Sequence, residues 1–212
     1  VNEAIEDKGQ WRESEWYKVL GQGYLAEASH LAHAADPKAH LMYNDYNMFF
    51  RAKRDAVVGM LRQFKGDGVP THGVGMQGHL GIDTPDLGEV EKSIEAFARE
   101  GVRVHVTELD VDVLPSVWAV NGAEISSRFE YKPELDPYTK GLPAAMEEKL
   151  SRRYEAIFKL FLKHRDKIER VTTWGVCDDA SWLNGFPVEG RTNYPLLFDR
   201  AHKPKLAYQR VA

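Results

Sequence analysis

Apolar and polar positions follow two different periods along this chain of 212 residues. Short runs rich in β-branched and apolar residues predict strands over 39–44, 71–77, 102–110 and 170–177. Apolar residues at helical spacing predict helices over 14–35, 48–64, 86–100 and 144–165. Because strands and helices alternate, the pattern favours an α/β fold built from parallel βα units over a sandwich or a helical bundle.

The strand count predicts an incomplete barrel. The pattern contains four complete strands and the end of another before residue 3, which is just over half of a (β/α)8 barrel. Such a barrel takes about 250 residues. An open half-barrel would expose apolar strand faces and unpaired strand edges. We therefore expect 1–212 to be the C-terminal part of a single barrel domain, completed by an upstream segment of the same protein or by a second chain.

Between 114 and 142 the periodicity fades, and this predicts a long loop, a feature that usually has a function inside a compact domain.

Composition narrows the classes of partner. With 32 acidic and 28 basic residues, and no basic block interleaved with aromatic residues, nucleic acid is not an expected partner. No apolar stretch approaches the roughly 18 residues of a membrane span, so no membrane association is expected. Cys177 is the sole cysteine, which excludes an internal disulfide.

Chemically active side chains gather where the predicted strands end. These side chains are Asn2, Glu3, Asn44, Tyr46, Gln77, His79, Glu108, Asp110 and Trp174. A barrel keeps its active site at the C-terminal ends of its strands, so the pattern predicts an active site there. Two carboxylates on different strands are the minimum equipment for splitting a glycosidic bond.

Six stretches of the sequence together resemble one enzyme family. They are VNEAIED (1–7), ADPKAHLMYNDYN (35–47), GVGMQGHL (73–80), VHVTELDVDV (104–113), VTTWGVCDDASWL (171–183) and GRTNYPLLFD (190–199). In this order they are similar to the C-terminal portion of glycoside hydrolase family 10, the retaining endo-β-1,4-xylanases. The resemblance covers essentially the whole chain and implies a (β/α)8 barrel, here from the end of strand 4 to helix 8.

The resemblance implies that Glu3 is the general acid/base and Glu108 the nucleophile. A retaining enzyme places its two carboxyl groups about 5 to 5.5 Å apart, so that one attacks the anomeric carbon while the other protonates the leaving oxygen. Gln77 is expected to contact Glu3 or the leaving-group side. This chemistry requires neither a metal nor a cofactor, and none is expected.

His79 and Asp110 are implied to support the nucleophile. In the family pattern the histidine is hydrogen-bonded to the nucleophile and the aspartate orients the histidine, which would fix the orientation and charge of Glu108. Asp110 shares strand parity with Glu108, so both side chains can face one side. Two alternatives are a histidine with a purely structural role and a metal site built from His79, Glu108 and Asp110.

Five residues are implied to bind the sugar. Asn2 is expected to hydrogen-bond the sugar 2-hydroxyl at the cleavage site. Asn44 and Tyr46 are expected to line the aglycone side. Trp174 and Trp182 match the family's aromatic walls on the glycone side, where sugar faces stack on indole rings.

The resemblance as a whole implies endo-hydrolysis of β-1,4-linkages in xylan by a double displacement with a glycosyl-enzyme intermediate. A polymeric substrate in turn implies an extracellular or periplasmic location. The rival interpretations are a non-catalytic carbohydrate-binding half-barrel and a β-1,4-glycanase with mixed xylan and cellulose activity.

Overall fold

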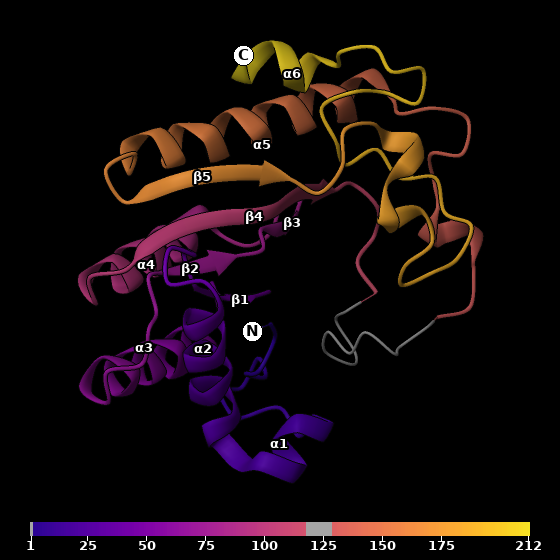
Figure 1. The fold of residues 1–212 in the computed structure, drawn as a ribbon. Coiled ribbons are helices and arrows are strands. Elements are labelled where there is room, and N and C mark those ends of the chain that lie inside the picture. The colour runs from indigo at the N-terminus through magenta and orange to yellow at the C-terminus, as the bar shows by residue number, and fades with distance from the viewer. Residues whose placement is uncertain (1, 118–128) are drawn as a thin grey trace. The chain divides into compact units, whose positions relative to one another are not determined.

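The computed structural model describes residues 2–117 and 129–212 (Figure 1). Its strands are β1 (Met42–Asp45), β2 (Gly73–Met76), β3 (His79–Gly81), β4 (Arg103–Asp112) and β5 (Ile168–Thr173). Its helices are α1 (Glu15–Leu20), α2 (Tyr24–Ala35), α3 (Arg51–Gly66), α4 (Leu87–Arg99), α5 (Ala144–Lys163) and α6 (Leu206–Val211). Short 3₁₀ segments lie at Gly21–Gly23, Pro133–Leu135, Asp178–Ala180 and Trp182–Asn184.

The chain divides into two compact units. Unit 1 consists of Val1–Gly78, Leu87–Thr107 and His164–Val171. Unit 2 consists of His79–Asp86, Glu108–Lys163 and Thr172–Ala212. Strands β4 and β5 each contribute residues to both units.

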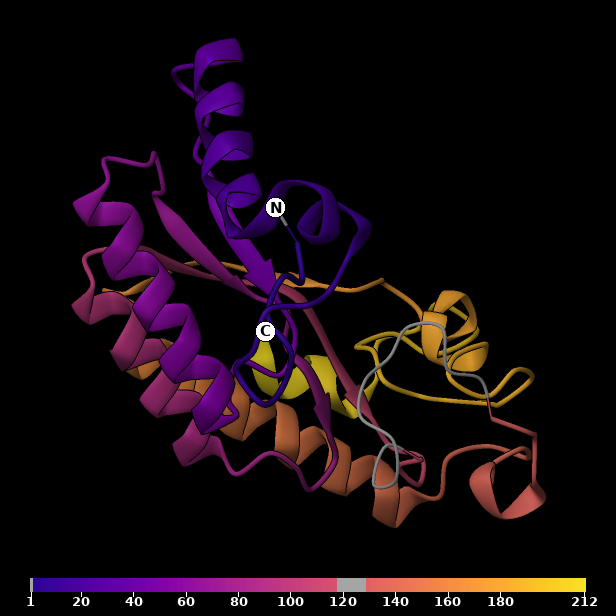
Figure 2. The ribbon, with the colours of Figure 1, turned by 90° about the horizontal axis from the view of Figure 1, so that it is seen from below.

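Unit 1 is a parallel sheet covered by helices. β1 pairs with β2, and β2 pairs with the Arg103–Val106 part of β4, in both cases in parallel. Helices α3 and α4 run beside one another in both views (Figures 1 and 2). Val57 of α3, Ile94 and Phe97 of α4 and Val104 of β4 are completely buried, so apolar helix faces and strand side chains form the core. Each such side chain contributes about 1.5 to 3 kcal/mol by leaving water.

Unit 2 is built around the end of β4 and the long helix α5. β3 pairs in parallel with Asp110–Asp112 of β4. Leu150, Tyr154 and Ile157, one turn apart on α5, are completely buried, and the Tyr154 hydroxyl donates to the Pro195 carbonyl oxygen at 2.6 Å. Helix α6 packs along α5 (Figure 1).

The parallel strands and intervening helices confirm the predicted βα units, while two details differ from the prediction. The helix expected over 14–35 begins at the N-cap Ser14, whose hydroxyl accepts from the Tyr17 N–H. It is interrupted at Gly21, whose φ of +66° only glycine adopts readily. Strand β3 was not predicted, because three residues are too few to show a period of two.

The long loop predicted over 114–142 is partly described. Its residues 118–128 lie outside the described part of the chain, and Pro133–Leu135 forms a single 3₁₀ turn. Trp16 on α1 has 69% of its surface exposed. In the described residues, no helix combines the length and apolar character needed to cross a membrane.

Candidate active site

Glu3 lies at a strand end of unit 1 in an unusual backbone conformation. Its φ is +55°, in the left-handed region, which costs a non-glycine residue roughly 1 to 2 kcal/mol. The Glu3 N–H donates to the Asn44 carbonyl oxygen at 2.9 Å, and Asn2 forms a parallel bridge with Asn44. The end of β1 therefore holds the chain at Glu3 in this conformation.

The two carboxylate oxygens of Glu3 have different partners. Gln77 Nε2 donates to Oε1 at 2.9 Å, which is the contact expected for Gln77. Arg12 Nη1 lies 3.4 Å from Oε2. We call Glu3, Gln77 and Arg12 the Glu3 cluster. Its side chains are partly or wholly buried, so hydrogen bonds to the carboxylate are stronger than on an open surface.

Arg12 is a site residue that sequence reasoning missed. Its guanidinium also contacts Glu6 Oε1 at 3.0 Å and the Tyr46 hydroxyl. Burial lowers the pKa of Arg12, but the charges of Tyr46, Glu6 and Glu3 outweigh burial and raise this pKa above its ordinary value. A lone arginine in the segment between Glu3 and α1 gave no signal in the sequence, because only folding brings it back to Glu3.

Tyr46 contacts Arg12 of this cluster and has little exposed surface. Only 8% of the residue is exposed, and Lys53 Nζ lies 3.5 Å from the centre of its ring. Burial raises the pKa of the Tyr46 hydroxyl. The structure therefore gives Tyr46 contacts that position Arg12 and Lys53, and its expected contact with sugar stays a prediction.

Asn2 and Asn44 are joined side chain to side chain. Asn44 Nδ2 donates to Asn2 Oδ1 at 2.7 Å, and the Thr107 hydroxyl donates to Asn44 Oδ1 at 2.6 Å. Thr107 reaches Asn44 across β2 because Gly75 has no side chain; a Cβ there would collide with Asn44 Oδ1 and lie 3.0 Å from Thr107 Cγ2. Gly75 thus leaves the space in which the Asn2–Asn44 pair is held.

In unit 2, His79 lies between two carboxylates. Its Nδ1 is 3.0 Å from Asp110 Oδ1 and its Nε2 is 3.4 Å from Glu108 Oε2. The short strand β3 causes this arrangement, because its register pairs His79 directly with Asp110. Trp182 Nε1 donates to Asp110 Oδ2 at 2.7 Å, so both oxygens of this buried carboxylate are satisfied. We call Glu108, His79, Asp110 and Trp182 the Glu108 cluster.

The His79 imidazole is positively charged at neutral pH. Burial lowers its pKa, but the charge and hydrogen bond of Asp110, followed by the hydrogen bond of Glu108, raise the His79 pKa to about 9. With both ring nitrogens protonated, His79 can donate to both carboxylates. Glu108 therefore faces a cation.

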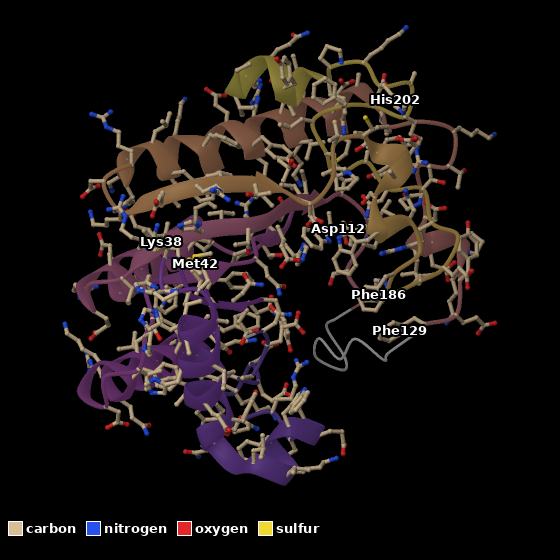
Figure 3. The ribbon with its side chains drawn as sticks, in the orientation of Figure 1. Lys38, Met42, Asp112, Phe129, Phe186 and His202 are labelled. Atoms are coloured by element: carbon tan, nitrogen blue, oxygen red, sulfur yellow. The ribbon has the colours of Figure 1, made fainter. Side chains whose placement is uncertain are left out.

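The two tryptophans differ in exposure. The Trp182 ring stacks on Phe186, labelled in Figure 3, with centroids 5.1 Å apart and planes 18° apart. Trp174 is 46% exposed, and its ring meets His79 edge-on at 6.3 Å. Gly175 follows at φ +128°, where a Cβ would lie 2.9 Å from Leu196 Cδ1. Trp174 thus presents an open aromatic face, whereas Trp182 is fixed by Asp110 and Phe186.

Potential metal ligands occur elsewhere. Within the described residues, the groups able to hold an ion are His40–His105–Glu169, Cys177–Asp179–His202 and Glu91–Glu95–His164. None of these described groups contains Glu3 or Glu108, so the alternative metal site on His79, Glu108 and Asp110 gains no support from the geometry.

Comparison with known proteins shows which family the chain belongs to. The model of glycosyl hydrolase family 10 matches residues 1–212. The chain belongs to glycoside hydrolase family 10. The family fold is a (β/α)8 barrel, and the parallel βα units described above are part of it, as the sequence predicted.

Characterised relatives match the chain along its whole length. It is 49% identical over 211 residues to endo-1,4-beta-xylanase A of Xylanibacter ruminicola, covering 100% of this chain and 57% of that protein. It is 42% identical over 216 residues to an endo-1,4-beta-xylanase of Geobacillus stearothermophilus, with shares of 100% and 60%. A solved structure of a GH10 endoxylanase from a sugarcane soil metagenome superimposes with a TM-score of 0.96 at 62% identity, with shares of 100% and 61%. The chain therefore spans about three fifths of the length of these relatives.

Proposed function

We propose that the protein containing this chain is a retaining endo-β-1,4-xylanase. The observation that carries the proposal is the Glu108 cluster, in which a charged His79 is held between Glu108 and Asp110. A carboxylate facing a fixed imidazolium, in a family 10 chain whose relatives are named endo-1,4-beta-xylanases, is suited to attack an anomeric carbon.

In the first step, Glu108 forms a bond to the anomeric carbon as the glycosidic C–O bond breaks. Glu3 gives its proton to the departing oxygen and becomes a carboxylate. Gln77 Nε2 and Arg12 Nη1 then donate to the two oxygens of this carboxylate. The Glu3 cluster thus supports the charged form that the second step requires.

In the second step, the Glu3 carboxylate takes a proton from water, and the water oxygen attacks the anomeric carbon. The bond to Glu108 breaks, and its electron pair returns to the carboxylate. His79 stabilises this returning negative charge through Nε2. The separation of the Glu3 and Glu108 carboxylates, about 5 to 5.5 Å in retaining enzymes, stays a prediction.

Substrate contacts follow from the exposed parts of the two clusters. The Asn2–Asn44 pair offers amide groups for sugar hydroxyls, and Asn2 is exposed. The open face of Trp174 is suited to stacking on a sugar ring, with Trp182 beside His79. A polymeric substrate implies action outside the cytoplasm, and we propose an extracellular or periplasmic location on that ground.

We also propose that a further segment, upstream in the same protein or in a second chain, supplies the remaining barrel strands. This accords with the 57% and 61% shares of the relatives that the chain covers. A denaturing gel of the active material tests this: a polypeptide longer than this chain, or a companion fragment of roughly 100 residues or more, is expected. Activity from the 212-residue chain alone would refute it.

The function is tested by release of reducing sugar from β-1,4-xylan by the complete protein. Glu108→Ala should lower the rate roughly a thousandfold or more, whereas Glu130→Gln, at an exposed glutamate of unit 2, should leave it unchanged. Retained activity in Glu108→Ala would overturn the proposal. Binding of xylan without hydrolysis would favour a carbohydrate-binding module, and equal rates on cellulose would favour a mixed glycanase.

A further inference from the structure

Three side chains of metal-binding type converge near the N-terminal ends of strands in unit 1. His40 lies two residues before β1, His105 is the third residue of β4 and Glu169 is the second residue of β5. One ligand atom from each of these residues lies within 4.8 Å of the others. None of these three residues has a part in the proposed mechanism; on β4, Glu108 and Asp110 lie further along the strand than His105.

The fold explains how residues from separate strands meet here. β2 lies between β1 and β4, and its Gly73 and Gly75 have no side chains. A Cβ on Gly73 would come within 3.0 Å of Met42 Sδ, because the β1 side chains lean across β2. Figure 3 labels Lys38 and Met42, which lie two residues on either side of His40. The His40 and His105 ring centroids are 6.3 Å apart.

One distance within this group already suits a tetrahedral ion. Zn²⁺ binds histidine nitrogen and carboxylate oxygen at about 2.0 to 2.2 Å, so two ligands of one tetrahedron are roughly 3.3 Å apart. His105 Nε2 and Glu169 Oε2 are 3.3 Å apart already. His105 is buried, whereas His40 is exposed.

His72 packs against His40. The His72 ring stacks on His40 with centroids 5.0 Å apart and planes 14° apart. His72 Nδ1 accepts a hydrogen bond from the Leu41 N–H at 2.9 Å, so this nitrogen is engaged. His72 therefore orients His40 and is not itself counted as a ligand.

Glu169 also has a cationic neighbour. Arg103 Nε lies 3.5 Å from Glu169 Oε2 and competes with an ion, although Arg103 Nη1 also donates to the Asp166 carbonyl oxygen at 2.9 Å.

We propose that His40, His105 and Glu169 bind a divalent transition-metal ion, for which Zn²⁺ is the probe. Two imidazoles and one carboxylate form a donor set that favours Zn²⁺, Ni²⁺ and Cu²⁺ over Mg²⁺ or Ca²⁺. Water completes the tetrahedron. The ion joins the segment before β1 to β4 and β5. Because it binds the folded form, it also raises the stability of unit 1.

The test is a calorimetric titration of the complete protein with ZnCl₂, repeated with CoCl₂ while the visible absorption of a tetrahedral Co²⁺ site is followed. One equivalent should bind with the site intact. His40→Gln and His105→Gln should each weaken binding about tenfold or more. Arg103→Gln should tighten it, since the competing cation is gone. His30→Gln, at an exposed histidine of α2, is the matched control and should change nothing.

The exposed His40 keeps the test valid if the buried His105 variant fails to fold, and circular dichroism checks each variant. Zn²⁺ should also raise the melting temperature of the wild type but not that of His40→Gln. Absence of saturable binding would overturn the proposal. So would binding that survives His40→Gln but is lost in His202→Gln or His164→Gln, which belong to the other two groups of possible ligands.

Discussion

Asp110→Asn tests the electrostatic reasoning behind the Glu108 cluster. Asp110 is 1% exposed and accepts from two donors, His79 Nδ1 at 3.0 Å and Trp182 Nε1 at 2.7 Å. Asparagine has nearly the same shape but no charge, and its amide can accept from only one of the two donors. The substitution therefore removes the largest favourable contribution to the positive charge on His79.

The magnitude follows from the His79 pKa. It rises from 6.5 to about 9 in the folded protein, although burial acts against the charge. At 1.36 kcal/mol per unit, the folded environment favours the imidazolium by on the order of 3 kcal/mol. An opposite charge at hydrogen-bonding distance shifts a pKa by about 1 to 3 units. We therefore expect the His79 pKa in Asp110→Asn to fall by about 1 to 3 units.

The sign for stability is fixed by the raised pKa. A protonated His79 stabilises the folded wild type fully below pH 6.5, and this contribution is lost as the pH rises through about 9. In Asp110→Asn the stabilisation by protonated His79 should be smaller, and it should be lost completely at a lower pH. Nuclear magnetic resonance titration of the His79 Cε1 proton gives the pKa, and urea midpoints between pH 6 and 10 give the stability.

Asp112→Asn is the matched control, because it removes another carboxylate of β4 that hydrogen-bonds Asn193 and not His79. Asp112, which is labelled in Figure 3, follows Asp110 by two residues along the chain. A wild-type His79 that titrates near 6.5 would refute the reasoning. An equal fall of the His79 pKa in both variants would also refute it, since a general loss of structure would then be the cause.

Two further substitutions test positions in unit 1. Lys53→Met should lower the free energy of unfolding by about 3 to 5 kcal/mol, because Lys53 and Asp45 are both completely buried and paired at 2.8 Å; Lys92→Met, at an exposed lysine, should cost under about 1 kcal/mol by urea unfolding, and equal losses would contradict the account. Gly75→Ala should displace the Asn44 amide. Its main effect should be a higher KM for xylan, and the loss in free energy of unfolding should be the lesser effect. An unchanged KM would show that this amide does not bind the sugar.

The sequence predicted the parallel βα units because strongly periodic segments are decided locally. The helices α3, α4 and α5 lie within a few residues of their predicted bounds. The break at Gly21 was missed because the apolar period continues through it. The strand β3 was missed because its pairing with Asp110 is decided by tertiary contacts.

The contacts expected of Gln77, His79 and Asp110 occur in the structure, whereas other contacts of the candidate site were not predicted. The strand-end pattern and the family resemblance selected Glu3, Gln77, His79 and Glu108. No pattern selected Arg12, since a single arginine shows no spacing and its contact with Glu3 depends on the path of the chain. The hydrogen bond from Trp182 to Asp110 was likewise beyond the sequence, because long-range side-chain contacts leave no periodic trace.

The central claim is that Glu108 attacks the anomeric carbon and carries the sugar between the two steps. The most direct measurement is mass spectrometry of the complete protein after reaction with a 2-deoxy-2-fluoro xylobioside bearing an activated leaving group, which traps the glycosyl-enzyme. The account predicts one adduct per protein, on the peptide that contains Glu108, and none in Glu108→Ala. An adduct on Glu3 or on any other residue, or turnover of xylan with no covalent intermediate, would contradict it.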